Sequence, residues 1–184
     1  MTVAKLQRHS IRLRDYDYSQ AGAYFVTICT QDKKHLFGEI INGEMRLNDS
    51  GKIVKEEWLR SSEIRKEMTL DEWVIMPNHL HGIVVINDQT TNQSTLVGAH
   101  GRAPLLHRQP RSLSSFIAGF KSVTTKRING LCHIPANPVW QRNYYEHVIR
   151  DERELFKMRQ YTQENPLKWD LDPENPSRRH EILL

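Results

Sequence analysis

Short apolar runs of two different periodicities alternate along this chain, and this alternation restricts the fold more than any other feature. Residues 23–30, 69–76 and 79–86 are rich in β-branched and aromatic side chains, which favours strands. Between 36 and 47, the pair Asn42-Gly43 separates two apolar segments. Because these two residue types tolerate positive φ, the segment predicts a hairpin with a type I′ turn.

Helical spacing marks three further segments. Asn48, Asp49 or Ser50 could cap a helix that runs to about residue 65, and a second helix is predicted over 112–128. Asp151 has capping spacing to Glu154 and begins a third helix. This helix should end near Asn165, because Pro166 disfavours helical geometry in the residue before it. Residues 139–149 are expected to form a short strand or extended segment.

Strands that alternate with helices, and are joined in part by a hairpin, predict an α+β fold in which helices cover an antiparallel sheet. The ferredoxin-like arrangement is the simplest of these. The 184 residues, 38% apolar and 26% charged, suit one domain with its core over about 20–170. A polar insertion is expected over about 88–110, and an irregular tail over about 167–184.

Composition also excludes several classes of protein. No apolar run approaches the roughly 18 residues of a membrane span, and residues 1–10 lack the apolar stretch of a signal peptide. The two cysteines, Cys29 and Cys132, are too few for a disulfide framework. We therefore expect a cytoplasmic protein with reduced thiols and no membrane partner.

The positive charge is concentrated in one part of the chain. Residues 89–145 contain no Asp or Glu, whereas both flanking segments are slightly acidic. Such a stretch makes a local positive field that suits a phosphate backbone, although a solvated basic face would have the same composition. The candidate DNA-binding residues are Arg102, Arg108, Arg111, Lys121, Lys126, Arg127 and Arg142.

The pair His79 and His81 is the sharpest local motif. On an extended strand both side chains lie on one face, about 6.5–7 Å apart along the strand, so two imidazoles can converge on one ion. Gly82 would leave room for a backbone or a ligand. The alternative is that the two histidines are polar residues on the solvated face of an edge strand.

The last predicted helix could complete an active site. Tyr161 and Asn165 are four residues apart and so share one helix face. The Asn165 amide could serve as a third ligand, with Glu164 as a second choice. The alternative is a helix-terminal asparagine and a packing tyrosine.

Three motifs together resemble the single-tyrosine HUH transposases, and more narrowly their REP-associated tyrosine transposase branch. They are His79-Leu80-His81, then residues 139–152, VWQRNYYEHVIRDE, and then Tyr161-x-x-x-Asn165-Pro166. The resemblance implies a ferredoxin-like sheet that carries the histidines and a helix that carries the tyrosine. Two departures are the absence of a Gly-x-Ser-x-Tyr pattern near the N-terminus and the polar Thr162 after the tyrosine.

The resemblance also implies a chemistry. His79, His81 and Asn165 would bind Mg²⁺ or Mn²⁺, and Tyr161 would attack single-stranded or hairpin DNA to form a 5′-phosphotyrosine. His147 would either support the metal ligands or the DNA without binding the ion directly, or be an ordinary hydrogen-bonded histidine. The protein would act at the nucleoid. A homodimer in which Tyr161 serves the site of the partner is possible, as is a monomer. The alternatives are a domesticated, non-catalytic module that binds DNA hairpins, and a metal-dependent hydrolase in which water attacks.

Overall fold

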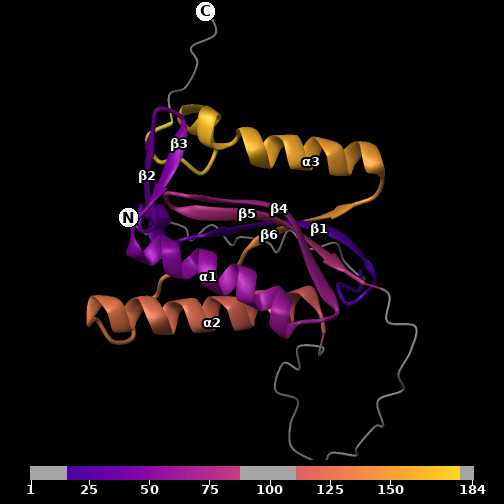
Figure 1. Cartoon of the computed structure of the whole chain (residues 1–184), viewed down its shortest axis with the longest axis horizontal. Coiled ribbons are helices and arrows are strands. Elements are labelled where there is room, and N and C mark those ends of the chain that lie inside the picture. The colour runs from indigo at the N-terminus through magenta and orange to yellow at the C-terminus, as the bar shows by residue number, and fades with distance from the viewer. Residues whose placement is uncertain (1–15, 88–110, 179–184) are drawn as a thin grey trace, which may run out of the picture.

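A four-stranded antiparallel sheet in the order β4-β5-β1-β6 organises the molecule, with helices on both faces (Figure 1). The structure is a computed structural model that describes residues 16–87 and 111–178. The sheet strands and the first two helices follow one another as β1, α1, β4, β5, α2 and β6. This is the β-α-β-β-α-β pattern of the ferredoxin-like fold, so the predicted fold class is confirmed.

Most boundaries agree closely with the sequence periodicity. The strand expected over 139–149 forms only at 145–149, however, and the helix expected to end at 128 continues to 132. The strands are β1 (Gly22–Cys29), β2 (Gly38–Ile41), β3 (Glu44–Leu47), β4 (Met68–Met76), β5 (His79–Ile86) and β6 (Tyr145–Ile149). The α-helices are α1 (Asp49–Ile64), α2 (Leu113–Cys132) and α3 (Glu152–Glu164), and two short 3-10 helices are η1 (Gln31–Lys33) and η2 (Pro166–Leu171). Of the described helices, none combines the length and the apolar character needed to cross a bilayer.

Local signals account for these boundaries. Asn42 and Gly43 have φ angles of 53° and 77°, which confirms the primed turn between β2 and β3. The Asn48 side chain accepts a hydrogen bond from the Gly51 amide and caps α1. Asp151 caps α3 in the same way through the Glu154 amide. Each signal involves residues that are neighbours in sequence.

The main core lies between the sheet and the pair α1 and α2. Trp58 of α1 stacks edge-to-face on Phe116 and Phe120 of α2, with ring centroids 5.5 and 5.1 Å apart. A Cβ atom on Gly82 would meet the Trp58 ring at 2.6 Å. The space that Gly82 was expected to leave for a backbone or a ligand is therefore filled by a core side chain.

The opposite face of the sheet is covered by α3 (Figure 1). A smaller apolar cluster lies between them. Phe25, Ile83 and Ile149 of the sheet pack there against Leu155 and Met158 of α3. Alternation along β5 sends Leu80, Val84 and Ile86 into the main core. His79 and His81 consequently lie on the α3 face.

Candidate active site

The two histidines lie on a central strand and are almost completely buried. His79 and His81 are 0% and 3% exposed, and their ring centroids are 4.4 Å apart. Because β5 is paired on both sides, by β4 and β1, the alternative of a solvated edge strand is wrong. Burial, and after it the neighbouring His81 ring, lowers the pKa of His79, so this imidazole is neutral near pH 7.

Two polar side chains orient the imidazoles. His79 Nδ1 lies 2.8 Å from Asn78 Oδ1. The Asn78 amide nitrogen donates to the backbone carbonyls of Lys33 and Glu174, which settles which amide atom is the oxygen. His79 must then donate from Nδ1, and the lone pair of its Nε2 is directed into the site. Thr27 Oγ1, from β1, contacts His81 Nδ1 at 2.8 Å.

A carboxylate that sequence reasoning did not single out completes the group. Asp172 follows η2 and is buried, with Oδ2 3.9 Å from His79 Nε2 and 4.0 Å from His81 Nε2. Burial alone would raise the pKa of Asp172, but the His81 and His79 rings, the Asn165 amide and a backbone N–H lower it to about 2. Asp172 is therefore ionised near neutral pH.

Asn165, the predicted third ligand, also lies in this group. Its amide nitrogen donates to Asp172 Oδ2 at 2.8 Å, which leaves its Oδ1 atom as the acceptor of the amide. Asn165 Oδ1 and His79 Nε2 are buried and have no hydrogen-bond partner among the described residues. Glu164, the second choice as a ligand, instead pairs with Lys168 and Gln160 on the surface of the helix.

The donor set fits a divalent metal ion. His79, His81 and Asp172 present one ligand atom each, all within 4.8 Å of one another. Buried polar atoms without partners are rare and costly, and an ion would satisfy the free lone pairs of His79 and Asn165. Imidazole, carboxylate and amide ligands together suit Mn²⁺ and related ions, with the oxygen ligands favouring Mg²⁺. The group could therefore bind a metal.

Tyr161 lies over the same group. Its hydroxyl is 3.5 Å from His81 Nε2, and its ring packs against His81 and Phe25. Burial, and after it the negative charge of Asp172, raises the pKa of Tyr161 to about 12. The phenol therefore keeps its proton near neutral pH. Tyr161 as a whole is 39% exposed, so its side chain contacts the buried group on one side and the solvent on the other.

The position of Tyr161 is fixed because α3 is anchored on two strands. His147 of β6 bonds to Glu154 of α3 through Nε2 at 2.6 Å. Farther along the helix, the Arg159 guanidinium makes two hydrogen bonds with the Asp71 carboxylate of β4, at 2.9 and 2.6 Å. His147 therefore has the role of a hydrogen-bonded histidine that supports the helix. It is not one of the described residues that form the candidate metal group.

The candidate DNA-binding residues are spread over different parts of the molecule. Arg102 and Arg108 lie outside the described residues. Lys121, Lys126 and Arg127 belong to α2, on the sheet face opposite to α3 and Tyr161 (Figure 1). Lys126 and Arg127 are both exposed, and Arg127 forms ion pairs with Glu56 and Glu57 of α1.

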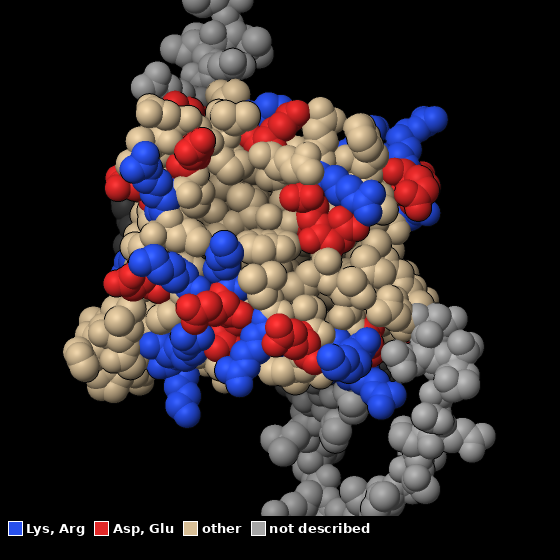
Figure 2. Space-filling view, viewed as in Figure 1, with Lys and Arg blue, Asp and Glu red and all other residues tan. Residues whose placement is uncertain are grey.

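The charge of Arg127 is therefore balanced by acidic side chains of α1 and does not contribute to a one-signed surface. Figure 2 shows acidic and basic side chains interleaved across the face that it views. The Lys121 Nζ atom donates to the backbone carbonyls of Gln141 and Asn143, and so supports the loop before β6. Arg142, between those two residues, is exposed. The residue before it, Gln141, donates its amide to the carbonyl of Cys29, at the end of β1 where Cys29 pairs with His79.

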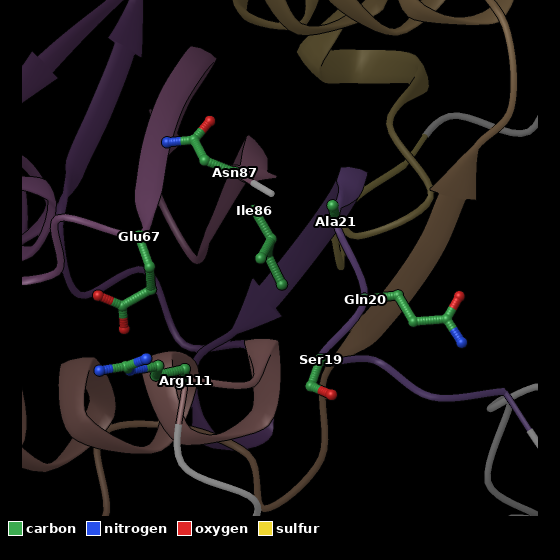
Figure 3. A pocket seen from close by; sticks show the side chains of 7 residues that line it. All are labelled: Ser19, Gln20, Ala21, Glu67, Ile86, Asn87 and Arg111. Carbon is green, nitrogen blue, oxygen red and sulfur yellow. The ribbon is translucent and has the colours of Figure 1, made fainter. Parts of the chain in front are cut away.

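Arg111 lies at the other end of the sheet. It lines an open pocket of about 360 Å³ together with Ser19, Glu67 and Asn87 (Figure 3). Ile86 at this pocket pairs with Gly22, at the opposite end of the β1–β5 ladder from His79. The pocket is therefore separate from the histidine group.

Asp172, Asn78 and Thr27 are the residues that the sequence analysis missed. Asp172 lies in the segment expected to be an irregular tail, which carries no periodicity from which a side-chain direction could be inferred. Asn78 precedes His79 directly, so proximity was its only signal. Thr27 reaches His81 across the sheet through a register that pairs the two residues, and no local pattern reveals that register.

Comparisons with known proteins find related sequences and a related fold. No family model matches the chain. An uncharacterised protein of Haemophilus influenzae is 42% identical over 167 residues, which cover 90% of this chain and 91% of that protein. The chain therefore belongs to the same family as that protein. A second Haemophilus influenzae protein, named "Putative REP-associated tyrosine transposase", is 24% identical over 83% of this chain and 74% of its own length.

A solved structure has the same fold. It is a REP-associated tyrosine transposase bound to a REP hairpin, with a TM-score of 0.57 and 18% identity. The match covers 87% of this chain and 74% of that one. The resemblance to REP-associated tyrosine transposases that the three motifs indicated is thus confirmed.

Proposed function

We propose that this protein cleaves and rejoins single-stranded or hairpin DNA through Tyr161. The premise is that the chain has the fold of the REP-associated tyrosine transposases and resembles them in sequence. The observation that supports this proposal is the juxtaposition of Tyr161 with the buried His79, His81 and Asp172 group. A tyrosine hydroxyl next to a candidate metal site combines a nucleophile with the means to stabilise charge on a phosphate.

In this proposal His79, His81 and Asp172 hold a divalent ion, and Asn165 Oδ1 supplies a further ligand oxygen. A bound Mg²⁺ or Mn²⁺ ion would act as a Lewis acid toward the phosphoryl oxygens. Asn78 and Thr27 keep the two imidazoles turned into the site. Asp172 offsets part of the positive charge, and through Asn165 it ties the ligand group to the end of α3.

The covalent step exchanges one phosphate ester for another. The Tyr161 oxygen forms a bond to phosphorus, and the bond from phosphorus to the 3′ oxygen breaks, with its electron pair leaving on that oxygen. The products are a 5′-phosphotyrosine and a strand with a free 3′-hydroxyl. Since the pKa of Tyr161 is raised, the phenol proton must be lost during attack, to a base or to solvent.

The phosphotyrosine keeps the energy of the broken ester. A second 3′-hydroxyl can therefore attack it and join two strands without ATP, which returns Tyr161 to its free form. The solved relative is bound to a REP hairpin, and we propose a hairpin as the substrate here too. Such a substrate would place this protein at the nucleoid in the cytoplasm.

The proposal is tested by incubating end-labelled hairpin oligonucleotides, with single-stranded flanks, with the protein and Mn²⁺. We expect a labelled adduct that survives denaturing electrophoresis and is absent from Tyr161→Phe. Tyr145→Phe, which removes another exposed tyrosine hydroxyl on the α3 face of the sheet, is the matched control and should retain the adduct. Cleavage by Tyr161→Phe would indicate attack by water. Binding without any adduct from the wild type would indicate a non-catalytic module.

A further inference from the structure

Tyr144 and Tyr145 are adjacent in sequence but lie on opposite faces of the sheet. Tyr144 packs against the main core, with the Lys121 ammonium 5.4 Å from its ring centroid. Tyr145 is the first residue of β6 and points to the α3 face, where it is 40% exposed. A single exposed aromatic ring is common on protein surfaces, so the significance of Tyr145 depends on where it lies relative to the candidate active site.

The strand register places Tyr145 beside the candidate active site. Thr27 of β1 pairs with Tyr145 on one side and with His81 on the other. At about 4.8 Å between neighbouring strands, the Cα atoms of Tyr145 and His81 are about 10 Å apart across the sheet. Tyr145 is therefore at the same level of the sheet as the metal-ligand candidate and Tyr161.

The course of α3 leaves Tyr145 accessible. Three residues of β6 face this side of the sheet, and α3 covers two of them. Ile149 packs on Leu155 and Met158, and His147 bonds to Glu154. The helix then crosses toward β4, where Arg159 and Gln163 bond to Asp71 and Glu72. Only the end of β6 that carries Tyr145 lies beyond these contacts.

An exposed cation lies close by. Arg142 precedes Tyr145 by three residues, in the loop whose carbonyls are held by Lys121. This loop runs beside the end of β1, because the Gln141 amide donates to the Cys29 carbonyl. One rim of the candidate site therefore presents a flat ring and a positive charge, the two groups by which proteins bind single-stranded nucleic acid.

We infer that Tyr145 stacks on a base of the single strand next to the phosphate that Tyr161 attacks, and that Arg142 contacts a neighbouring phosphate. The inference rests on the proposed function, whose site it extends by a nucleobase subsite. Stacking is tolerant of sequence because every base has a π-face. Tyr145 would therefore hold the strand in place without selecting its sequence.

The test measures binding of a fluorescent twenty-nucleotide oligo-dT by anisotropy at several salt concentrations. Tyr145→Ala should weaken binding about 5- to 100-fold, and Tyr145→Phe should stay within about twofold of the wild type. On a strand of equal length with abasic sites throughout, Tyr145→Ala and wild type should bind equally. Arg142→Ala should instead reduce the salt dependence by about one phosphate contact on both strands.

Phe156→Ala is the matched control. Phe156 is 66% exposed, and its separation of five residues from Tyr161 places it on a different side of α3, so its loss should not alter binding. Unchanged oligo-dT binding in Tyr145→Ala, an equal loss on the abasic strand, or no binding by the wild type would each overturn the inference. A wild type that binds through Tyr145 but forms no covalent adduct would instead refute the proposed function alone.

Discussion

The oxygen and the nitrogen of the Asn78 side-chain amide have different partners. Its oxygen accepts from His79, and its nitrogen donates to the backbone carbonyl of Glu174, two residues beyond Asp172. One buried amide thus fixes the tautomer of one candidate ligand and the position of the segment that carries another. Metal binding and docking of the 172–178 segment should consequently depend on each other.

Replacing Asn78 should therefore weaken metal binding. We expect Asn78→Ala to lower the affinity for Mn²⁺ about 10- to 100-fold in titration calorimetry, as is typical when the partner of a ligating histidine is removed. Asn87→Ala is the control, because the Asn87 side chain bonds only to Thr69 among the described residues. Equal Mn²⁺ affinities of Asn78→Ala and the wild type would show that Asn78 does not orient His79.

Gly82 lies next to His81 but serves the opposite face of the sheet. A methyl group at this position would meet the Trp58 ring at 2.6 Å. We expect Gly82→Ala to lower the free energy of unfolding by about 1–3 kcal/mol in denaturant titrations. At Gly119 of α2 a Cβ would meet nothing within 4 Å, so Gly119→Ala should stabilise the protein by up to about 1 kcal/mol. A neutral Gly82→Ala would contradict the close packing described here.

At the scale of elements, α3 is held on the sheet by both apolar and polar contacts. Leu155 and Met158 make its apolar contacts with the smaller cluster. The Arg159 guanidinium makes two hydrogen bonds with the carboxylate of Asp71 on β4. The pair lies two residues from Tyr161 in sequence. We therefore expect it to influence how closely the tyrosine hydroxyl approaches His81.

Asp71→Asn should loosen this attachment. The pair is partly exposed, so we expect a loss of only about 0.5–1 kcal/mol in the free energy of unfolding. Misplacement of Tyr161 should nevertheless slow adduct formation about 10- to 100-fold while Mn²⁺ affinity is unchanged. Asp49→Asn, which breaks the exposed pair with Lys52 on α1, is the control. A rate equal to that of the wild type would rule out a positioning role for the pair.

The same pair predicts a pH dependence. The hydrogen bonds from Arg159 lower the pKa of Asp71 below its ordinary value of 3.8. The stabilisation is therefore fully present above that value and is lost as the pH falls through the lower pKa of the folded state. Asp71→Asn should accordingly flatten the loss of stability of the wild type in acid.

Sequence reasoning succeeded where neighbours in the chain determine the structure. The Asn42-Gly43 turn, the Asn48 and Asp151 caps, and the alternation that turns His79 and His81 to one face all depend on residues a few positions apart. Asp172 could not be placed in this way, because a segment without regular structure gives no direction to its side chains. The ion pairs of Arg127 with α1 were equally hidden, since they depend on how two distant helices pack.

At the scale of the whole molecule, the sheet separates two functions. Its α1–α2 face carries the main core, and its α3 face carries the candidate active site (Figure 1). The basic α2 residues that composition assigned to DNA lie on the core side. Within one chain, Tyr161 already contacts His81, so the arrangement requires no second copy.

Mixing two inactive variants tests this arrangement. We expect a mixture of His81→Ala and Tyr161→Phe to form no more covalent DNA adduct than either variant alone, because neither chain contains both groups. Size-exclusion chromatography of the same mixture reports whether the chains associate. Restoration of the adduct in the mixture would show that Tyr161 acts in the site of a partner.

The most direct test of the central claim is to locate the covalent bond between protein and DNA. After reaction of the wild type with a hairpin oligonucleotide and Mn²⁺, nuclease and trypsin digestion should leave residues 160–168, QYTQENPLK, which contain Tyr161 as their only tyrosine. Mass spectrometry should find a 5′-phosphonucleotide on Tyr161. A nucleotide on any other residue, or cleaved DNA with no modified peptide, would contradict the account.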